Sequence, residues 1–109
     1  MAKLTAKFFV RIASVLKTET TNEEIDTQEG IRELKHLLPL DFMTRNDRAQ
    51  IVKICDDLSM QVDADRNPTK AELFEKFARN AAVFFKQQNE RFQKERFLTA
   101  AGFPTWGGR

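Results

Sequence analysis

The sequence predicts an all-α fold, an irregular bundle of about five helices in one domain. Gly and Pro are scarce, at four and three of 109 residues, so the chain has few of the tight turns that a many-stranded β-sandwich needs. Apolar residues instead recur at helical spacing along most of the chain. We expect the domain to span residues 1–102, and we expect residues 103–109 to form a flexible tail.

The first predicted helix covers residues 3–17. At about 100° per residue, its apolar side chains fall in one arc and its cations in the opposite arc. Val10 is the one apolar residue among the cations, and the segment FFVRIASVL alternates too poorly for a strand. The helix therefore presents a basic face without an acid, made of Lys3, Lys7, Arg11 and Lys17.

The second predicted helix covers residues 27–38. It ends at Leu38, because Pro39 disfavours helical geometry in the residue before it. Its start stays open, since both Thr21 and Thr27 have the spacing of a helix N-cap. Its apolar positions recur every three or four residues, as one buried face of a helix requires.

The third and fourth predicted helices cover residues 45–62 and 70–88. Thr44 stands three positions before an acid and is the expected N-cap of the third helix. Thr69 and Glu72 form the clearest capping box in the chain and open the fourth helix. Both helices carry their apolar residues on one face.

The last predicted helix covers residues 93–101 and ends at Gly102, a natural left-handed cap. The chain has ten Phe and no Tyr, and Phe fills apolar space without a polar handle, so we expect the rings to form the core. Between residues 84 and 97 the rings alternate with cations, as in a platform that stacks single-stranded nucleic acid. Burial is the favoured interpretation there, because these Phe residues also fit the apolar face.

No catalytic or metal site is predicted. His36 and Cys55 are the only His and Cys, too few for zinc, which needs three or four ligands. Cys55 lies on an apolar face and is expected to be a buried, inert thiol, and His36 is expected at the surface. The chain is therefore predicted to be no enzyme and to hold no cofactor.

Residues 63–67 have the D-x-D-x-N spacing that opens a calcium-binding EF-hand loop. Such a loop needs Gly at its sixth position and Glu at its twelfth. Pro68 and Phe74 occupy these positions here. The segment is therefore interpreted as a turn between two helices.

Charge is distributed in three blocks. The net charge of +2 divides into +4 for residues 1–17, −6 for residues 18–68 and +4 for residues 69–109. The basic face of the first helix could meet an anionic partner or be neutralised by the acidic middle, and both alternatives stay open. An exposed Trp in the Gly-rich tail is a second candidate surface. The candidate partner-binding residues are Lys3, Lys7, Arg11, Lys17, Trp106 and Arg109.

The leading functional hypothesis is a non-enzymatic protein-interaction module. The alternative is a nucleic-acid-binding protein that uses both basic ends, and self-association also stays open. No apolar run reaches the roughly 18 residues that a membrane span needs. A single Cys fits a reducing, cytoplasmic location. The basic N-terminal segment is similar to a targeting leader, but Arg11 interrupts its apolar stretch and no cleavage motif follows.

Residues 89–102, with the sequence NERFQKERFLTAAG, resemble a C-terminal signature of small uncharacterised phage, prophage and bacterial proteins, roughly N-P-R-F-D-x-x-R-F-L-x-A-C-G. Glu90 and Gln93 stand where the signature has Pro and Asp, which mark a break and a helix cap. The resemblance implies a last helix that Phe92, Phe97 and Leu98 fold onto the core. It also implies a phage or bacterial origin and a modulator or inhibitor that binds host machinery.

Overall fold

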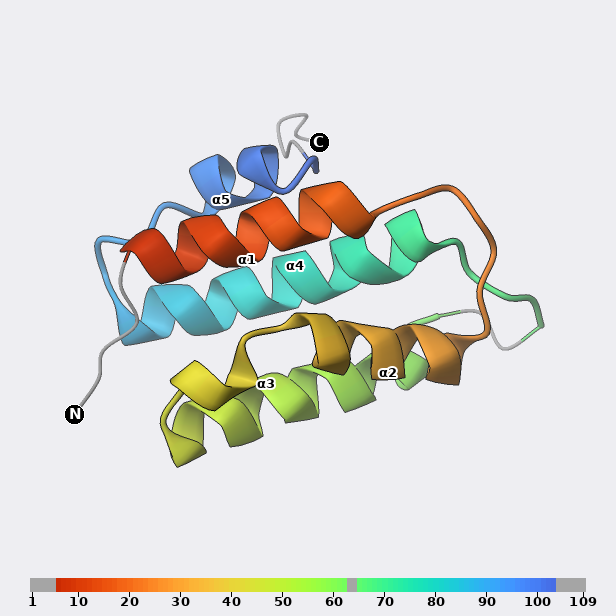
Figure 1. Ribbon diagram of the computed structural model, residues 1–109, viewed down its shortest axis with the longest axis horizontal. Coiled ribbons are helices and arrows are strands. Elements are labelled where there is room, and N and C mark those ends of the chain that lie inside the picture. Colours follow the sequence, from red (N-terminus) through yellow and green to blue (C-terminus); the bar gives the residue numbers. More distant parts are fainter. Residues whose placement is uncertain (1–5, 63–64, 104–109) are drawn as a thin grey trace.

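The computed structural model describes residues 6–62 and 65–103. Within these residues the chain forms five α-helices and two short 3₁₀ helices (Figure 1). Outside the helices, the described part holds only an isolated antiparallel bridge between Glu24 and Thr69. The all-α prediction is confirmed. The elements are α1 (Ala6–Glu19), α2 (Thr27–Leu37), η1 (Leu40–Phe42), α3 (Arg45–Asp57), η2 (Leu58–Met60), α4 (Lys70–Gln88) and α5 (Lys94–Ala100).

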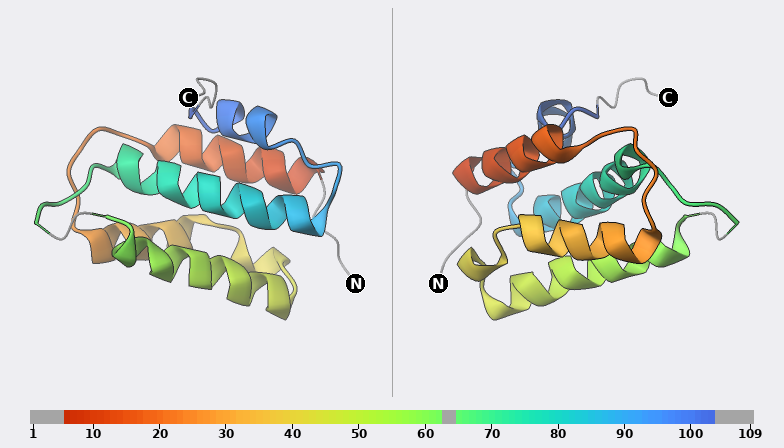
Figure 2. Two further views of the ribbon diagram at one scale, coloured as in Figure 1. Left: turned by 180° about the vertical axis from the view of Figure 1, so that it is seen from behind. Right: turned by 45° about the vertical axis from the view of Figure 1, so that its right-hand side comes forward.

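Helix α4, the longest, lies between two helix pairs. Figures 1 and 2 show α1 and α5 together on one side of it and α2 with α3 on the other. Helix α4 packs against α2, α3 and α5, and α1 packs chiefly against α5. No helix among the described residues is long and apolar enough to cross a membrane.

An aromatic cluster joins α1, α4 and α5. The ring centroid of Phe9 lies 4.8 Å from that of Phe85 and 4.6 Å from that of Phe92, and Phe97 lies 5.7 Å from Phe85. All four rings are buried, and burying each stabilises the fold by about 1.5–3 kcal/mol. The prediction that Phe forms the core is confirmed here. It is wrong for Phe42, which is 67% exposed.

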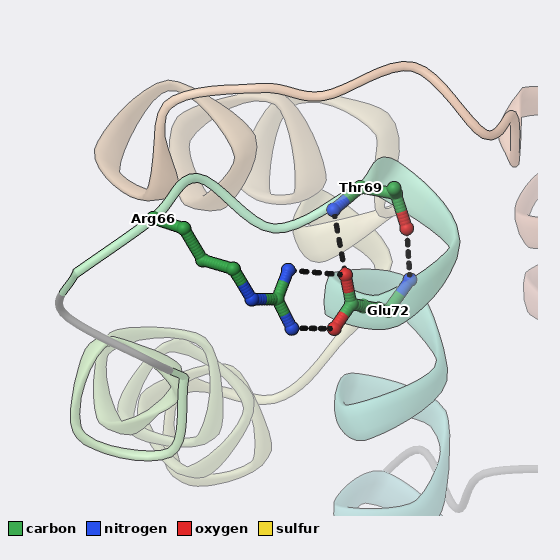
Figure 3. Close-up of polar contacts among 3 residues, drawn as sticks. All are labelled: Arg66, Thr69 and Glu72. Carbon is green, nitrogen blue, oxygen red and sulfur yellow. Dashed lines mark hydrogen bonds and ion pairs between the residues drawn. The ribbon is translucent and has the colours of Figure 1, made fainter.

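Helix α4 begins with the predicted capping box, extended by an arginine (Figure 3). The Thr69 hydroxyl accepts from the Glu72 amide, and a Glu72 carboxylate oxygen accepts from the Thr69 amide, both at 3.1 Å. Arg66 donates to both carboxylate oxygens, at 3.2 and 3.0 Å. Both carboxylate oxygens of Glu72 therefore accept hydrogen bonds at the helix start, and Asp63 of the EF-hand-like segment lies outside the described residues.

Two other helix starts differ in how well the sequence predicted them. Thr44 caps α3 as expected, since its hydroxyl accepts from the Asp47 amide at 3.1 Å. Helix α2 begins at Thr27, and its cap is Asp26, whose carboxylate accepts from the amides of Gln28 and Glu29. Thr21 opens no helix, because its segment pairs with the start of α4: the Ala71 amide donates to the Thr21 carbonyl at 2.9 Å.

The predicted helix at 45–62 is too long as an α-helix. Regular α-helix ends at Asp57 and continues as the 3₁₀ turn η2. The Ser59 hydroxyl donates to the Asp56 carbonyl at 3.0 Å, so a side chain competes for a backbone acceptor at this point. Helices often tighten to 3₁₀ geometry in their last turn.

The tail was predicted to begin at Phe103, but Phe103 belongs to the core. Gly102 has φ +92°, and its amide donates to the Thr99 carbonyl at 3.0 Å while the Phe103 amide donates to the Leu98 carbonyl at 2.7 Å. These two bonds form a Schellman motif, which closes a helix with a hydrophobic residue after the glycine. Phe103 is buried in the core and is therefore no part of the tail, whose residues 104–109 lie outside the described part.

Candidate partner-binding groove

A groove of about 350 Å³ runs between α1 and α5. The two helices run parallel, since Phe9 contacts Phe92 before α5 begins and the Lys17 side chain passes Gly102 just after α5 ends. Figure 1 shows them side by side. The groove is lined by Phe9, Val10, Ala13, Asn89, Arg91, Phe92, Gln93, Arg96, Phe97 and Ala100.

The turn between α4 and α5 supplies part of the groove lining. The Lys86 ammonium donates to the carbonyls of Glu90 and Phe92, at 2.6 and 3.2 Å, and so closes the end of α4. The Asn89 side chain accepts from the Arg91 amide at 3.0 Å. These bonds stabilise the break between α4 and α5. In the signature that residues 89–102 resemble, Pro and Asp stand at this break.

The groove has an apolar floor and mixed edges. Phe9, Phe92 and Phe97 are buried beneath it, and the small side chains of Ala13 and Ala100 leave the space open. On the α1 edge, Val10 is 65% exposed. On the α5 side, the exposed guanidinium groups of Arg91 and Arg96 line the groove. No carboxylate belongs to the described lining.

A basic strip, defined as Lys7, Arg11 and Lys17, lies on the exposed face of α1. Its residues are not among those that line the groove. Within the described part of the chain, these three cations form no ion pair with a carboxylate. The ion pairs placed there all join α2, α3, α4 and the segment before α4. They are Lys35–Asp56, Lys53–Asp57, Arg66–Glu72, Lys70–Glu33 and Arg79–Glu75.

The acidic middle therefore pairs with cations of its own region and of α4. Lys70 and Glu33 approach to 2.7 Å between α4 and α2, and Lys35 and Asp56 to 2.6 Å between α2 and α3. Neutralisation of the α1 cations by the middle, one of the two alternatives from the sequence, is not found among the described residues. The charge of the basic strip stays available to solvent or to a partner.

The candidate residues from the sequence are only partly placed. Lys3, Trp106 and Arg109 lie outside the described residues, whereas the strip lies where it was predicted. No local pattern in the sequence indicates the groove, because its two walls are about 80 residues apart in the chain. Val10 among the cations was the one local signal, since an apolar residue on a basic face suggests a contact surface.

The remaining reactive groups form no second site. Cys55 is fully buried, and burial raises the pKa of its thiol to about 12, so the nucleophilic thiolate is suppressed. His36 is exposed in the last turn of α2. Among the described residues, no group of three or more His, Cys, Asp or Glu is arranged to hold a metal ion.

Comparison with known proteins adds no family to these observations. No family model matches the sequence, and no curated protein or solved structure matches it significantly. The candidate site is therefore argued from its own geometry and charge.

Proposed function

We propose that this chain is a non-enzymatic protein-interaction module whose partner inserts apolar side chains into the groove between α1 and α5. One observation carries the proposal: an open apolar groove is bordered by cations that no carboxylate of the described chain compensates. Grooves between helices are a common seat for partner segments. Cations around such a groove favour an anionic partner and speed its association.

The position of Lys7 supports a role in binding a partner and not a role in stabilising the fold. It lies in the first turn of α1, where the positive end of the helix dipole makes a cation unfavourable by about 0.3–1 kcal/mol. The first turn of α1 holds no acid. Each of the other four α-helices has one there, namely Glu29, Asp47, Glu72 and Glu95. If the surface of α1 served stability alone, its first turn would be expected to hold an acid as well.

A nucleic-acid partner is the second candidate, because the basic strip and the two groove arginines could contact phosphates. The rings that would stack bases argue against it. The four rings of this region are all buried, namely Phe84, Phe85, Phe92 and Phe97. The Phe residues that alternate with cations here therefore form the core and are not available to stack bases. The narrower proposal of a phage-encoded inhibitor of host machinery depends on the resemblance of residues 89–102 alone.

Selection from a displayed peptide library tests the module directly. Ala100 is exposed at the surface and lines the groove, so Ala100→Trp fills the groove without entering the core. Met60→Trp is the matched control, since Met60 is 83% exposed on η2. Peptides selected on the wild-type chain should bind Ala100→Trp at least about tenfold more weakly and Met60→Trp unchanged. Failure to select any peptide that distinguishes the two variants would contradict the proposal.

A further inference from the structure

We infer that the groove receives an acidic amphipathic α-helix of its partner, with an apolar stripe in the groove and carboxylates on both sides of the stripe. This inference rests on the proposed function and adds the conformation and charge of the bound segment.

The backbone of the groove favours a helix over a strand. The long walls are the helices α1 and α5, whose backbone groups are hydrogen-bonded within the helix, and the turn 89–93 closes one end. The helical walls offer no sheet edge for an extended peptide. Two helices side by side form ridges and a furrow that a third helix can fill. Along α5 the lining runs from Gln93 to Ala100, an advance of about 10 Å. Two turns of a bound helix, with apolar side chains at i, i+3 or i+4, and i+7, cover that length.

The lining selects apolar side chains for the buried stripe. Phe9, Phe92 and Phe97 form the floor, and the two alanines leave room above it. The amides of Asn89 and Gln93 lie toward the end where the chain enters α5. A polar residue of the partner fits only there, because elsewhere it would lose its hydrogen bonds to water without replacement.

The cations lie on both sides of this stripe. Arg91 and Arg96 line the groove on the α5 side. On α1, Lys7 is three residues before Val10, which places it one helical turn away on the same face. Lys17 lies two turns beyond Val10, beside Gly102. A partner helix in the groove would therefore meet cations along both flanks, and carboxylates are the complementary groups.

A second copy of this chain is a weaker occupant. Its acidic residues are concentrated in the segment that forms α2 and α3. Several of these carboxylates, including Glu33 and Asp56, already face a cation at 2.7 and 2.6 Å. Binding them to the basic strip would break existing ion pairs. A foreign helix with free carboxylates has no such competition.

Three synthetic peptides of about 15 residues test the inference. All three carry Leu at i, i+3, i+4 and i+7. The flanking positions are Glu in the first peptide, Gln in the second and Lys in the third. Binding is measured by fluorescence anisotropy at low and high salt, with the wild-type chain, Ala100→Trp, and the double variant Lys7→Gln with Lys17→Gln.

The Glu peptide should bind at least about tenfold more tightly than the Gln peptide, and the Lys peptide should not bind. Its affinity should fall with added salt, as expected for exposed charges. It should also fall about three- to tenfold in the double variant and be lost in Ala100→Trp.

Equal binding of the Gln or Lys peptide would overturn the inference, as would Glu-peptide binding that Ala100→Trp leaves intact. Concentration-dependent dimerisation that Ala100→Trp abolishes would assign the groove to a second copy. If single-stranded DNA displaces the Glu peptide equally from the wild-type chain and from Ala100→Trp, the cations would be assigned to nucleic-acid binding. Library peptides that need the groove but lack acids would refute this inference and leave the proposed function standing.

Discussion

The guanidinium carbon of Arg11 lies 5.3 Å from the centroid of the Phe42 ring. This contact joins α1 to η1, the 3₁₀ turn between α2 and α3. It gives the exposed Phe42 a partner, because a cation is attracted to the face of an aromatic ring. The ring carries no formal charge, so Arg11 keeps its own. The basic strip is thus held to the rest of the fold without being neutralised.

Replacing Phe42 should have a small effect on stability. The ring is 67% exposed, so Phe42→Ala loses an exposed cation–π contact worth about 0.5–1 kcal/mol and little buried area. The matched control is Phe85→Ala, which empties a fully buried position and should cost about 3–5 kcal/mol. Urea denaturation measures both. Similar losses for the two variants would show that Phe42 belongs to the core.

Lys7→Glu should stabilise the fold and weaken binding at the same time. A carboxylate in the first turn of α1 interacts favourably with the helix dipole, so the free energy of unfolding should rise by about 0.3–1 kcal/mol. Affinity for an acidic groove ligand should fall, since the strip loses a cation.

The control for Lys7→Glu is Lys53→Glu on α3. Lys53 lies 3.6 Å from Asp57 one turn later, and reversing its charge should destabilise the helix by a few tenths of a kcal/mol. Thermal denaturation at low salt compares the two variants. A fall in stability for Lys7→Glu would mean that Lys7 has a structural role that the dipole argument misses.

Glu72 should make stability depend on acid pH. The guanidinium of Arg66, together with the capping-box amide of Thr69, lowers the pKa of Glu72 from 4.5 to about 2. Because the folded pKa lies below the unfolded one, the contribution is complete above pH 4.5 and is lost as pH falls toward 2.

Glu72→Gln isolates this effect, since Gln keeps the capping-box geometry but does not ionise. The stability difference between wild type and Glu72→Gln should be largest near neutral pH and should shrink from about pH 4.5 down to about pH 2. Urea titrations over this pH range measure it. A difference that stays constant with pH would show that the carboxylate charge does not matter.

Gly30→Ala should destabilise the protein, although Ala is the better helix former by about 1 kcal/mol. A Cβ at Gly30 would lie 2.2 Å from Cδ2 of Leu73, and Leu73 is fully buried. Relieving the clash requires either the packed Leu73 side chain or helix α2 to shift, and overpacking of this kind typically costs about 1–3 kcal/mol. In the double variant with Leu73→Ala the two losses should be less than additive. Full additivity would show that the two side chains do not meet.

The helices could be predicted from the sequence because their signals are local. The fourth helix was predicted at 70–88 and found at Lys70–Gln88, since the capping box at Thr69 fixes its first turn. Likewise Gly102 fixes the end of α5. The start of α2 stayed open because two threonines were candidate caps. The actual cap, Asp26, was missed although Glu29 stands three residues after it.

The groove could not be predicted, because it depends on which helices become neighbours. Nothing local shows that Ala13 and Ala100 face the same space, or that Lys86 bends the chain through two carbonyls. Lys7, Arg11 and Lys17 of the predicted basic face lie exposed on α1, but whether the acidic middle would cover them depended on how that middle paired its own charges. That pairing of charges is determined by the tertiary structure.

Amide chemical-shift mapping can show directly whether a partner binds between α1 and α5. The isotope-labelled chain is titrated with a peptide selected on the wild type. Shifts should concentrate on the groove residues from Phe9 to Ala13 and from Phe92 to Ala100, with the amides of α3 and η2 unchanged. Shifts centred on α2, α3 or η2, with α1 and α5 unaffected, would contradict binding in the groove.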